Sequence, residues 1–258
     1  MSNNNRREAE LLHGWRQATP ARIALGRYGS GMPTRAHLDF QLAHAQARDA
    51  VHSELDLSQL TELLSEPALT VRSAAADRSV YLKRPDLGRI LADNQDLQYG
   101  PYDAAIILAD GLSASAILAH GATIAKEVRR LLEGWNVAPF VIAEQARVAL
   151  GDDIAVRLGA KLAIVLIGER PGLSAADSVG AYLTWSPRRG RVDSQRNCVS
   201  NIRSPNGLPP QIGAANIAWL ARNAKERQMT GVGLKDDFSD QYRIKSEGAR
   251  IKHSEPDA

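Results

Sequence analysis

The sequence has little cysteine, few aromatic residues and no long apolar run. Its 258 residues include a single cysteine, Cys198, so no intramolecular disulfide can form and a reducing, cytoplasmic setting is expected. Aromatic residues make up 5% and the formal net charge is only +3, which argues against a nucleic-acid partner. The longest apolar runs, 104–109 and 162–167, are far below the ~20 residues of a membrane-spanning helix, so no membrane partner is expected.

The sequence also lacks the patterns typical of metal sites and secretory signals. Its six histidines include no pair at the spacing of two zinc ligands on one helix, and none lies near Cys198 in the sequence, so we predict no metal site. The first ten residues are polar and contain no apolar stretch, which argues against a secretory signal. The 44% hydrophobic and 24% charged residues are typical of a globular protein.

The first 98 residues are predicted to be an arm followed by a mostly helical region. Residues 1–33 are polar and rich in glycine, and we interpret them as an N-terminal arm. In the helical region, 34–98, small and apolar residues recur every three or four positions from 36 to 50, which predicts a helix. We also expect a helix over 58–65, a short strand over 80–82 and a helix from 85 to 91.

From residue 99 to residue 233 the pattern changes to alternating strands and helices. Continuous apolar segments predict buried strands at 103–109, 140–143 and 161–168, separated by amphipathic helices at 113–135 and 152–158. We expect further strands at 182–185 and 198–202, a last helix over 210–229, and a mobile tail over 234–258. The sequence therefore predicts an α/β protein: a Rossmann-like parallel sheet with helices on both faces, preceded by the helical region.

In such a sheet the ligand site lies beyond the carboxyl ends of the strands. Three segments follow predicted strands there: 110–113, where Ser113 can cap the next helix, 144–148 and 168–172. Glu169 and Arg170 emerge side by side from the third strand. These two residues either face a ligand or pair with each other or with neighbouring residues, and the sequence favours neither.

Residues 111–115 come close to the G-x-S-x-G turn of serine hydrolases, with Ser113 as the nucleophile. The catalytic triad of an α/β-hydrolase needs a histidine late in the chain. The histidine that follows His120 in this sequence is His253, which lies in the predicted tail. The hydrolase is therefore the alternative enzyme, and a non-catalytic binding module is the alternative outside catalysis. No dinucleotide or P-loop fingerprint occurs.

Several motifs together resemble the small (light) subunit of ethanolamine ammonia-lyase. The resemblance runs from about Pro20 to Gly233. The motifs that carry it are Arg84-Pro-Asp-Leu-Gly-Arg89, Asp110-Gly-Leu-Ser113, Gly168-Glu-Arg-Pro-Gly-Leu-Ser174, Asp177-Ser178, Tyr182-Leu-Thr184, Ser186-Pro187, Arg196-Asn-Cys-Val-Ser-Asn-Ile202, Gly207-Leu-Pro-Pro210 and Ala214-Ala215.

The resemblance implies an adenosylcobalamin enzyme that converts ethanolamine to acetaldehyde and ammonia. A TIM-barrel large subunit would carry the substrate and the radical chemistry, and several large and small subunits would form a hetero-oligomer. The residues that match the family's small-subunit cobalamin contacts are Val148, Glu169 and Cys198, and no catalytic residue is expected on this chain. A D-x-H-x-x-G motif is absent, so the cofactor is expected to keep its own base. Enclosure in a bacterial microcompartment stays open, since the N-terminus shows no amphipathic targeting helix.

Overall fold

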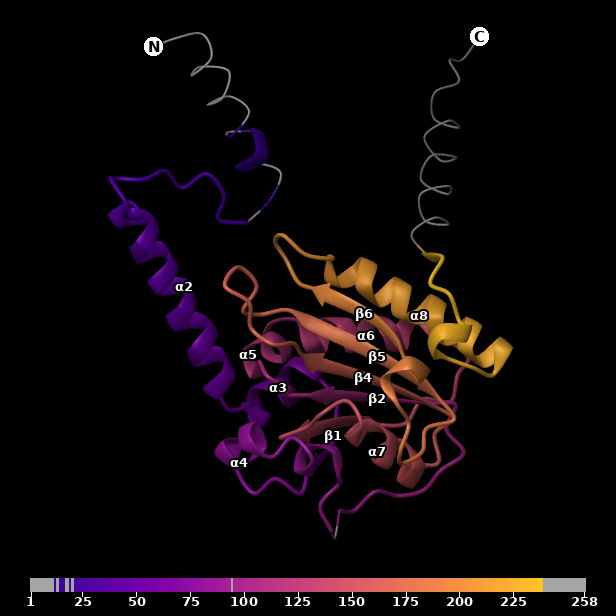
Figure 1. Cartoon of the computed structure of the whole chain (residues 1–258). Coiled ribbons are helices and arrows are strands. Elements are labelled where there is room, and N and C mark those ends of the chain that lie inside the picture. The colour runs from indigo at the N-terminus through magenta and orange to yellow at the C-terminus, as the bar shows by residue number, and fades with distance from the viewer. Residues whose placement is uncertain (1–11, 13, 17–18, 20, 94, 239–258) are drawn as a thin grey trace, which may run out of the picture.

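One six-stranded sheet with helices on both faces forms the centre of the molecule (Figure 1). The computed structural model describes residues 12, 14–16, 19, 21–93 and 95–238. The strands are β1 Ala68–Arg72, β2 Ala104–Ala109, β3 Phe140–Glu144, β4 Leu162–Gly168, β5 Val179–Trp185 and β6 Asn197–Ile202. The helices are α2 Thr34–His52, α3 Leu57–Leu64, α4 Arg78–Lys83, α5 Ala114–Ala116, α6 Ala122–Leu131, α7 Leu150–Leu158 and α8 Pro210–Arg227, with short helical turns at Leu87–Arg89, Ile117–Gly121, Asp193–Gln195 and Gly231–Gly233.

The strand order is β1-β3-β2-β4-β5-β6, which confirms the predicted α/β class. The first four strands in this order run parallel to one another, as expected from their continuous apolar sequences. β5 pairs with β4 in the antiparallel direction, and β6 pairs with β5 in the same way. The sheet is therefore mixed, and the predicted parallel sheet is limited to its first four strands.

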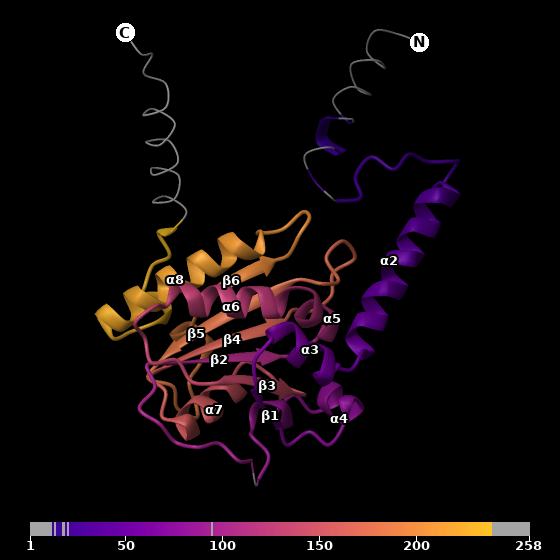
Figure 2. The ribbon, with the colours of Figure 1, turned by 180° about the vertical axis from the view of Figure 1, so that it is seen from behind.

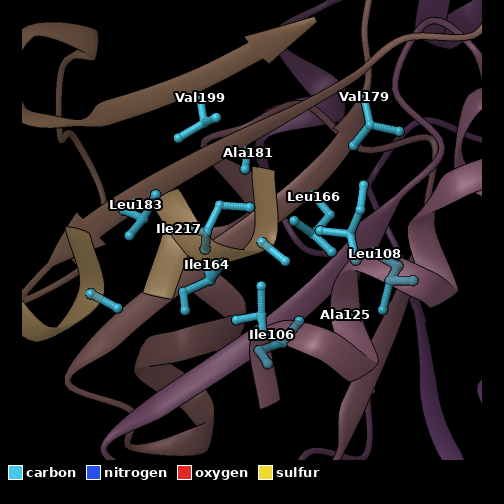
Figure 3. Close-up of a cluster of buried hydrophobic side chains, with 14 of the residues drawn as sticks. Ile106, Leu108, Ala125, Ile164, Leu166, Val179, Ala181, Leu183, Val199 and Ile217 are labelled. Carbon is cyan, nitrogen blue, oxygen red and sulfur yellow. The ribbon is translucent and has the colours of Figure 1, made fainter. Parts of the chain in front are cut away.

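The two faces of the sheet bury separate hydrophobic layers. On one face, side chains from β2, β4 and β5 pack against Ala125 of α6 and Ile217 of α8 (Figure 3). Helices α6, α8 and α3 lie on this side (Figure 2). On the other face, α7 covers β2 and β4, and it approaches closely because Gly151 has no side chain: a Cβ atom there would lie 2.2 Å from Val165 Cγ2. Both faces of β2 and β4 are therefore buried, which explains their uninterrupted apolar sequences.

β5 and β6 are covered by a helix on one face only. Val179, Ala181 and Val199 join the layer beneath α8. The alternate positions, Cys198 and Ser200 among them, face the side of α7, where no helix of the described residues packs over them and both are exposed. This face of β5 and β6, called the open face below, lies beside the carboxyl ends of β2, β3 and β4.

The N-terminal region differs from its predicted form in two places. Residues 68–72 form an edge strand, β1, because their side chains pack beside β3 although the segment is too short to show a clear period. The strand expected over 80–82 is wrong: these residues belong to α4, whose N-terminus is capped by the Asp77 carboxylate, which accepts a hydrogen bond from Val80 N. The helix expected over 85–91 is a single turn, Leu87–Arg89.

The other helices agree with the sequence patterns. α2, α3 and α7 lie where they were predicted, and Gly159 ends α7 in the left-handed conformation. The helix expected over 113–135 is α5 and α6 joined by a π-helical turn.

The tail predicted over 234–258 differs at its start. Leu234 is buried in the core, and residues 239–258 lie outside the described residues. Among the described residues, no helix has the length and apolar character needed to cross a membrane.

Candidate functional site

A pocket of about 400 Å³ opens at the carboxyl ends of the parallel strands. The three predicted segments meet here, because Leu112, Val148 and Glu169 each come from one of them. Tyr182 of β5 completes the wall from the open face, and Tyr81 of α4 lies at the other end. The site is therefore where the parallel-sheet rule placed it.

The structure brings the three predicted cofactor contacts together. Val148 and Glu169 line the pocket. Cys198 does not line the pocket, but it is the cross-strand partner of Tyr182, which does, so both side chains lie next to each other on the open face. Whether these residues contact a cofactor stays a prediction. Tyr182 belonged to a recognised motif, but the sequence analysis did not select it as a site residue, and its alternation with inward-facing Ala181 and Leu183 is the signal that could have done so.

Glu169 is held in a fixed position by β6. Its Oε1 accepts a 2.6 Å hydrogen bond from the Ser200 hydroxyl, and its Oε2 accepts one of 3.2 Å from the backbone N–H of Asn201. A bulge in β6 turns these donors toward Glu169, with Asn201 at a φ of 57°. Gly180 provides the space, because a Cβ atom there would lie 2.9 Å from Glu169 Oε1.

Of the alternative in which Glu169 and Arg170 pair with each other or with neighbours, the structure shows the second form for Glu169, which does not pair with Arg170. The partners of Glu169 lie on β6, and the structure shows no ion pair between the two residues. Arg170 lines the pocket with an exposed side chain, and within the described part of the chain its guanidinium has no hydrogen-bond acceptor. Adjacent residues on an extended backbone project in opposite directions, which explains why they separate.

Cys198 carries a protonated thiol at neutral pH. Desolvation raises the pKa of this thiol, the Glu169 carboxylate raises it further, and a hydrogen bond with Tyr182 acts in the opposite direction. A thiol is a weak nucleophile and a poor metal ligand compared with a thiolate. In the described part of the chain, no three His, Cys, Asp or Glu side chains are grouped so that they could hold a metal ion.

Asp110 holds together two of the loops that form the pocket. Its carboxylate accepts hydrogen bonds from the backbone N–H groups of Gly111, Gln145 and Ala146 at 2.8 to 3.0 Å, and from Arg78 at 3.1 Å. Burial raises the pKa of the Asp110 carboxyl to about 6, while these four donors lower it. The carboxylate therefore ties the loop after β2 to the loop after β3, which carries Val148.

Arg78 and Tyr81 were not foreseen as parts of the site. Arg78 is buried and donates to the backbone oxygens of Gly111 and Val51, so it links the pocket to the end of α2. Tyr81 is fully buried, and its hydroxyl donates to the Ala146 carbonyl oxygen at 2.9 Å. Both residues lie in α4, 27 to 65 positions away from these partners in the sequence, and no local pattern predicts such contacts.

Ser113 is a helix cap and has no catalytic partner. Its hydroxyl accepts from Ala116 N at 3.3 Å and donates to the Ala176 carbonyl oxygen at 2.8 Å, as expected for a capping residue. The side chain is fully buried, and within the described chain no histidine hydrogen-bonds to it. His120 instead faces Asp177 at 3.4 Å. The geometry does not form the nucleophile and base of a serine hydrolase.

The sequence as a whole is similar to proteins of one family. Residues 9–235 match the family model described as ethanolamine ammonia-lyase light chain. Proteins named "Ethanolamine ammonia-lyase small subunit" are similar over most of their length. That of Pseudomonas aeruginosa (strain LESB58) is 48% identical with 92% of each chain covered, and that of Xanthomonas campestris pv. campestris is 47% identical with 86% of each chain covered. The chain belongs to the ethanolamine ammonia-lyase light chain family.

Proposed function

We propose that this chain is the small subunit of an ethanolamine ammonia-lyase and forms one wall of its adenosylcobalamin site. The observation that carries the proposal is that Val148 and Glu169 line one open pocket and that Cys198 is the cross-strand partner of Tyr182, which lines the same pocket. These residues come from three different strand ends or strands, and they lie in the position where an α/β sheet binds its ligand.

The residues of the pocket fit a large amphipathic cofactor. Leu112, Val148 and Ile167 offer apolar surface, while Glu169 offers a carboxylate whose remaining lone pairs can accept hydrogen bonds from amide groups. A corrinoid is an extended ring fringed with amides, and it is much larger than a pocket of about 400 Å³. The chain can therefore cover only one side of it, and a partner must cover the other.

When bound, adenosylcobalamin supplies the homolysis of its cobalt–carbon bond, which starts the radical chemistry. The residues of this chain bind and orient the cofactor and exclude water from it. Glu169, held by Ser200 and Asn201, accepts hydrogen bonds from the cofactor. Val148 gives apolar contact, and Cys198 packs as a neutral thiol. We place the catalytic residues on the large subunit, since the carboxylate that lines this pocket, Glu169, is already engaged by hydrogen bonds from Ser200 and Asn201.

We propose that the partner is the TIM-barrel large subunit in a cytoplasmic hetero-oligomer. The small-subunit names of the relatives support a large partner. The open face of β5 and β6 supports its position, since a sheet face that no helix covers is available for another chain.

The proposal is tested by reconstitution. The purified chain should release no ammonia from ethanolamine, and mixing it with its large subunit and adenosylcobalamin should restore release. In the complex, Glu169→Gln should weaken cobalamin binding by about 1 to 3 kcal/mol, the range for a hydrogen bond to a charged group. Its melting temperature should stay unchanged because Glu169 lies beyond the strand core. Ammonia release by the chain alone, or full cobalamin affinity in the variant, would contradict the proposal.

A further inference from the structure

Arg147 separates the pocket from a second cavity of about 620 Å³. Together with Val148, it lines both. The backbone N–H of Arg147 donates to the Gly88 carbonyl oxygen at 2.8 Å, and its guanidinium lies 4.4 Å from the centre of the Tyr81 ring. The side chain is thus held in one place by a fully buried aromatic ring.

Among the residues that the structure describes, none accepts a hydrogen bond from the guanidinium of Arg147. Its Nε is buried without a hydrogen-bond partner, and none of its other nitrogens donates to a described residue. An unpaired buried donor on a charged group is costly, so a side chain fixed in this way indicates a missing partner.

The carboxylates that line the second cavity lie next to other arginines. Asp86 is paired with Arg84 and Asp153 with Arg189, each at 2.7 Å, and the 99% exposed Asp193 lies 3.8 Å from Arg196 in a weak contact. Arg89 also lines the cavity and, within the described chain, has no side-chain partner. The cavity therefore presents two guanidinium groups, those of Arg147 and Arg89, with which no carboxylate of the described residues pairs, and such groups favour an anion.

We propose that Arg147, with Arg89 beside it, binds the phosphodiester of the cobalamin nucleotide tail. The inference rests on the proposed function, because the corrin ring would then lie over the pocket of Val148 and Glu169. The tail leaves one edge of that ring and carries the cofactor's one phosphodiester before the base. Arg147 stands on the boundary between the two cavities, so it can reach an anion that leaves the first and enters the second.

The fork of an arginine matches the two free oxygens of a phosphodiester. Stacking on Tyr81 holds the plane of the guanidinium while its edge stays available, so little side-chain entropy is lost on binding. A lysine would provide a point charge without this geometry.

The test compares two corrinoids in the assembled complex of small and large subunits. Cobalamin carries the phosphodiester, whereas cobinamide has the same ring but ends before it. Arg147→Met keeps the length and the contact with Tyr81 but removes the charge. The matched control is Arg157→Met, which removes the same charge from an exposed position of α7 that lines neither cavity. Equilibrium dialysis gives the dissociation constant of each pair without any activity measurement.

We expect Arg147→Met to weaken cobalamin binding by about 10- to 100-fold, the equivalent of one charge-assisted hydrogen-bond pair, and to change cobinamide binding less than about twofold. Retained cobinamide binding also shows that the variant is folded. Arg147→Lys should recover part of the loss, and Arg157→Met should bind both ligands as the unmodified complex does.

Two results would overturn the inference and leave the proposed function in place. One is an unchanged affinity of Arg147→Met for cobalamin. The other is an equal loss for cobalamin and cobinamide, since Arg147 would then shape the pocket without contacting the phosphate. If the unmodified complex binds neither corrinoid, the proposed function itself fails, and this inference fails with it.

Discussion

The parallel strands β1 to β4 and the antiparallel strands β5 and β6 share one sheet but differ in what covers them. β2 and β4 are buried on both faces, and every residue of β2 is inaccessible to solvent. β5 and β6 are buried beneath α8 on one face, and the other face carries exposed Cys198 and Ser200. The first region is therefore a scaffold, and the second gives the site an open side.

The difference follows from the connections between strands. Parallel strands need crossover helices, and these helices cover both faces. Antiparallel strands can be joined by a loop, so one face stays uncovered unless another chain binds to it. In the proposed complex, the ends of the parallel strands would position the cofactor, and the antiparallel pair would leave one face for the partner.

One buried ion pair joins the two regions. Arg196, at the start of β6, donates to both carboxylate oxygens of Asp152 in the first turn of α7, at 2.8 and 2.6 Å. Both side chains are 2% exposed. Arg196 also donates to Thr184 Oγ1, so the contact fixes β5 and β6 relative to the helix that covers the parallel strands.

The largest effect is expected when this junction is broken. Asp152→Ala should lower the free energy of unfolding by about 3 to 5 kcal/mol, because it leaves the buried charge of Arg196 without its partner. Chemical denaturation of the full chain measures the change. Asp193→Ala is the matched control: Asp193 lies 3.8 Å from the same arginine but is 99% exposed, so its removal should cost less than about 0.5 kcal/mol. Equal losses in both variants would show that the buried pair does not join the regions.

A second prediction compares two substitutions on the same face of the sheet, one where α7 covers the face and one where no described helix does. Ile107 of β2 is fully buried beneath α7, whereas Cys198 of β6 faces the same side without a helix over it. Ile107→Ala should cost about 2 to 5 kcal/mol, because it removes apolar contacts and leaves a cavity. Cys198→Ala should change the free energy of unfolding by less than about 0.5 kcal/mol. A similar cost for both substitutions, measured by the same denaturation, would mean that the open face is covered in the isolated chain.

The two regions also differ in how well the sequence predicts them. β2, β3 and β4 were recognised from uninterrupted apolar residues, a pattern that burial on both faces imposes. β1 was missed because five residues at a sheet edge are too few to show a period. The strand predicted over 80–82 is wrong, because the cap formed by Asp77 starts a helix there.

Local sequence patterns predict where the site lies, but not which residues contact each other within it. The position beyond the strand ends follows from the parallel sheet, and Glu169 follows a predicted strand there, whereas Val148 and Cys198 were predicted only through the family resemblance. The partners of Glu169 were not predictable, because a bulge in β6 brings Ser200 and Asn201 to it from more than 30 residues away. Arg170, which one alternative offered as a partner, is next to Glu169 in sequence and yet unpaired with it. Long-range geometry, which depends on strand register, determines these contacts.

The smallest expected effect tests the electrostatics of the open face. The Glu169 carboxylate helps to raise the pKa of the Cys198 thiol. Glu169→Gln removes that charge, so the thiol pKa should fall and more thiolate should be present at pH 8. Because the thiolate is the reactive form, alkylation of Cys198 by iodoacetamide should become about two- to threefold faster, which corresponds to a pKa shift of a few tenths.

Mass spectrometry reads this rate directly in the isolated chain, since Cys198 is its one cysteine. Glu226→Gln is the matched control, because Glu226 lies on α8 beneath the opposite face of the sheet and should leave the rate unchanged. Unaltered alkylation in Glu169→Gln across the pH range would show that water screens the two groups from each other. The open face would then be solvated up to the edge of the pocket, and the partner subunit would have to displace that water to bring Cys198 against the cofactor.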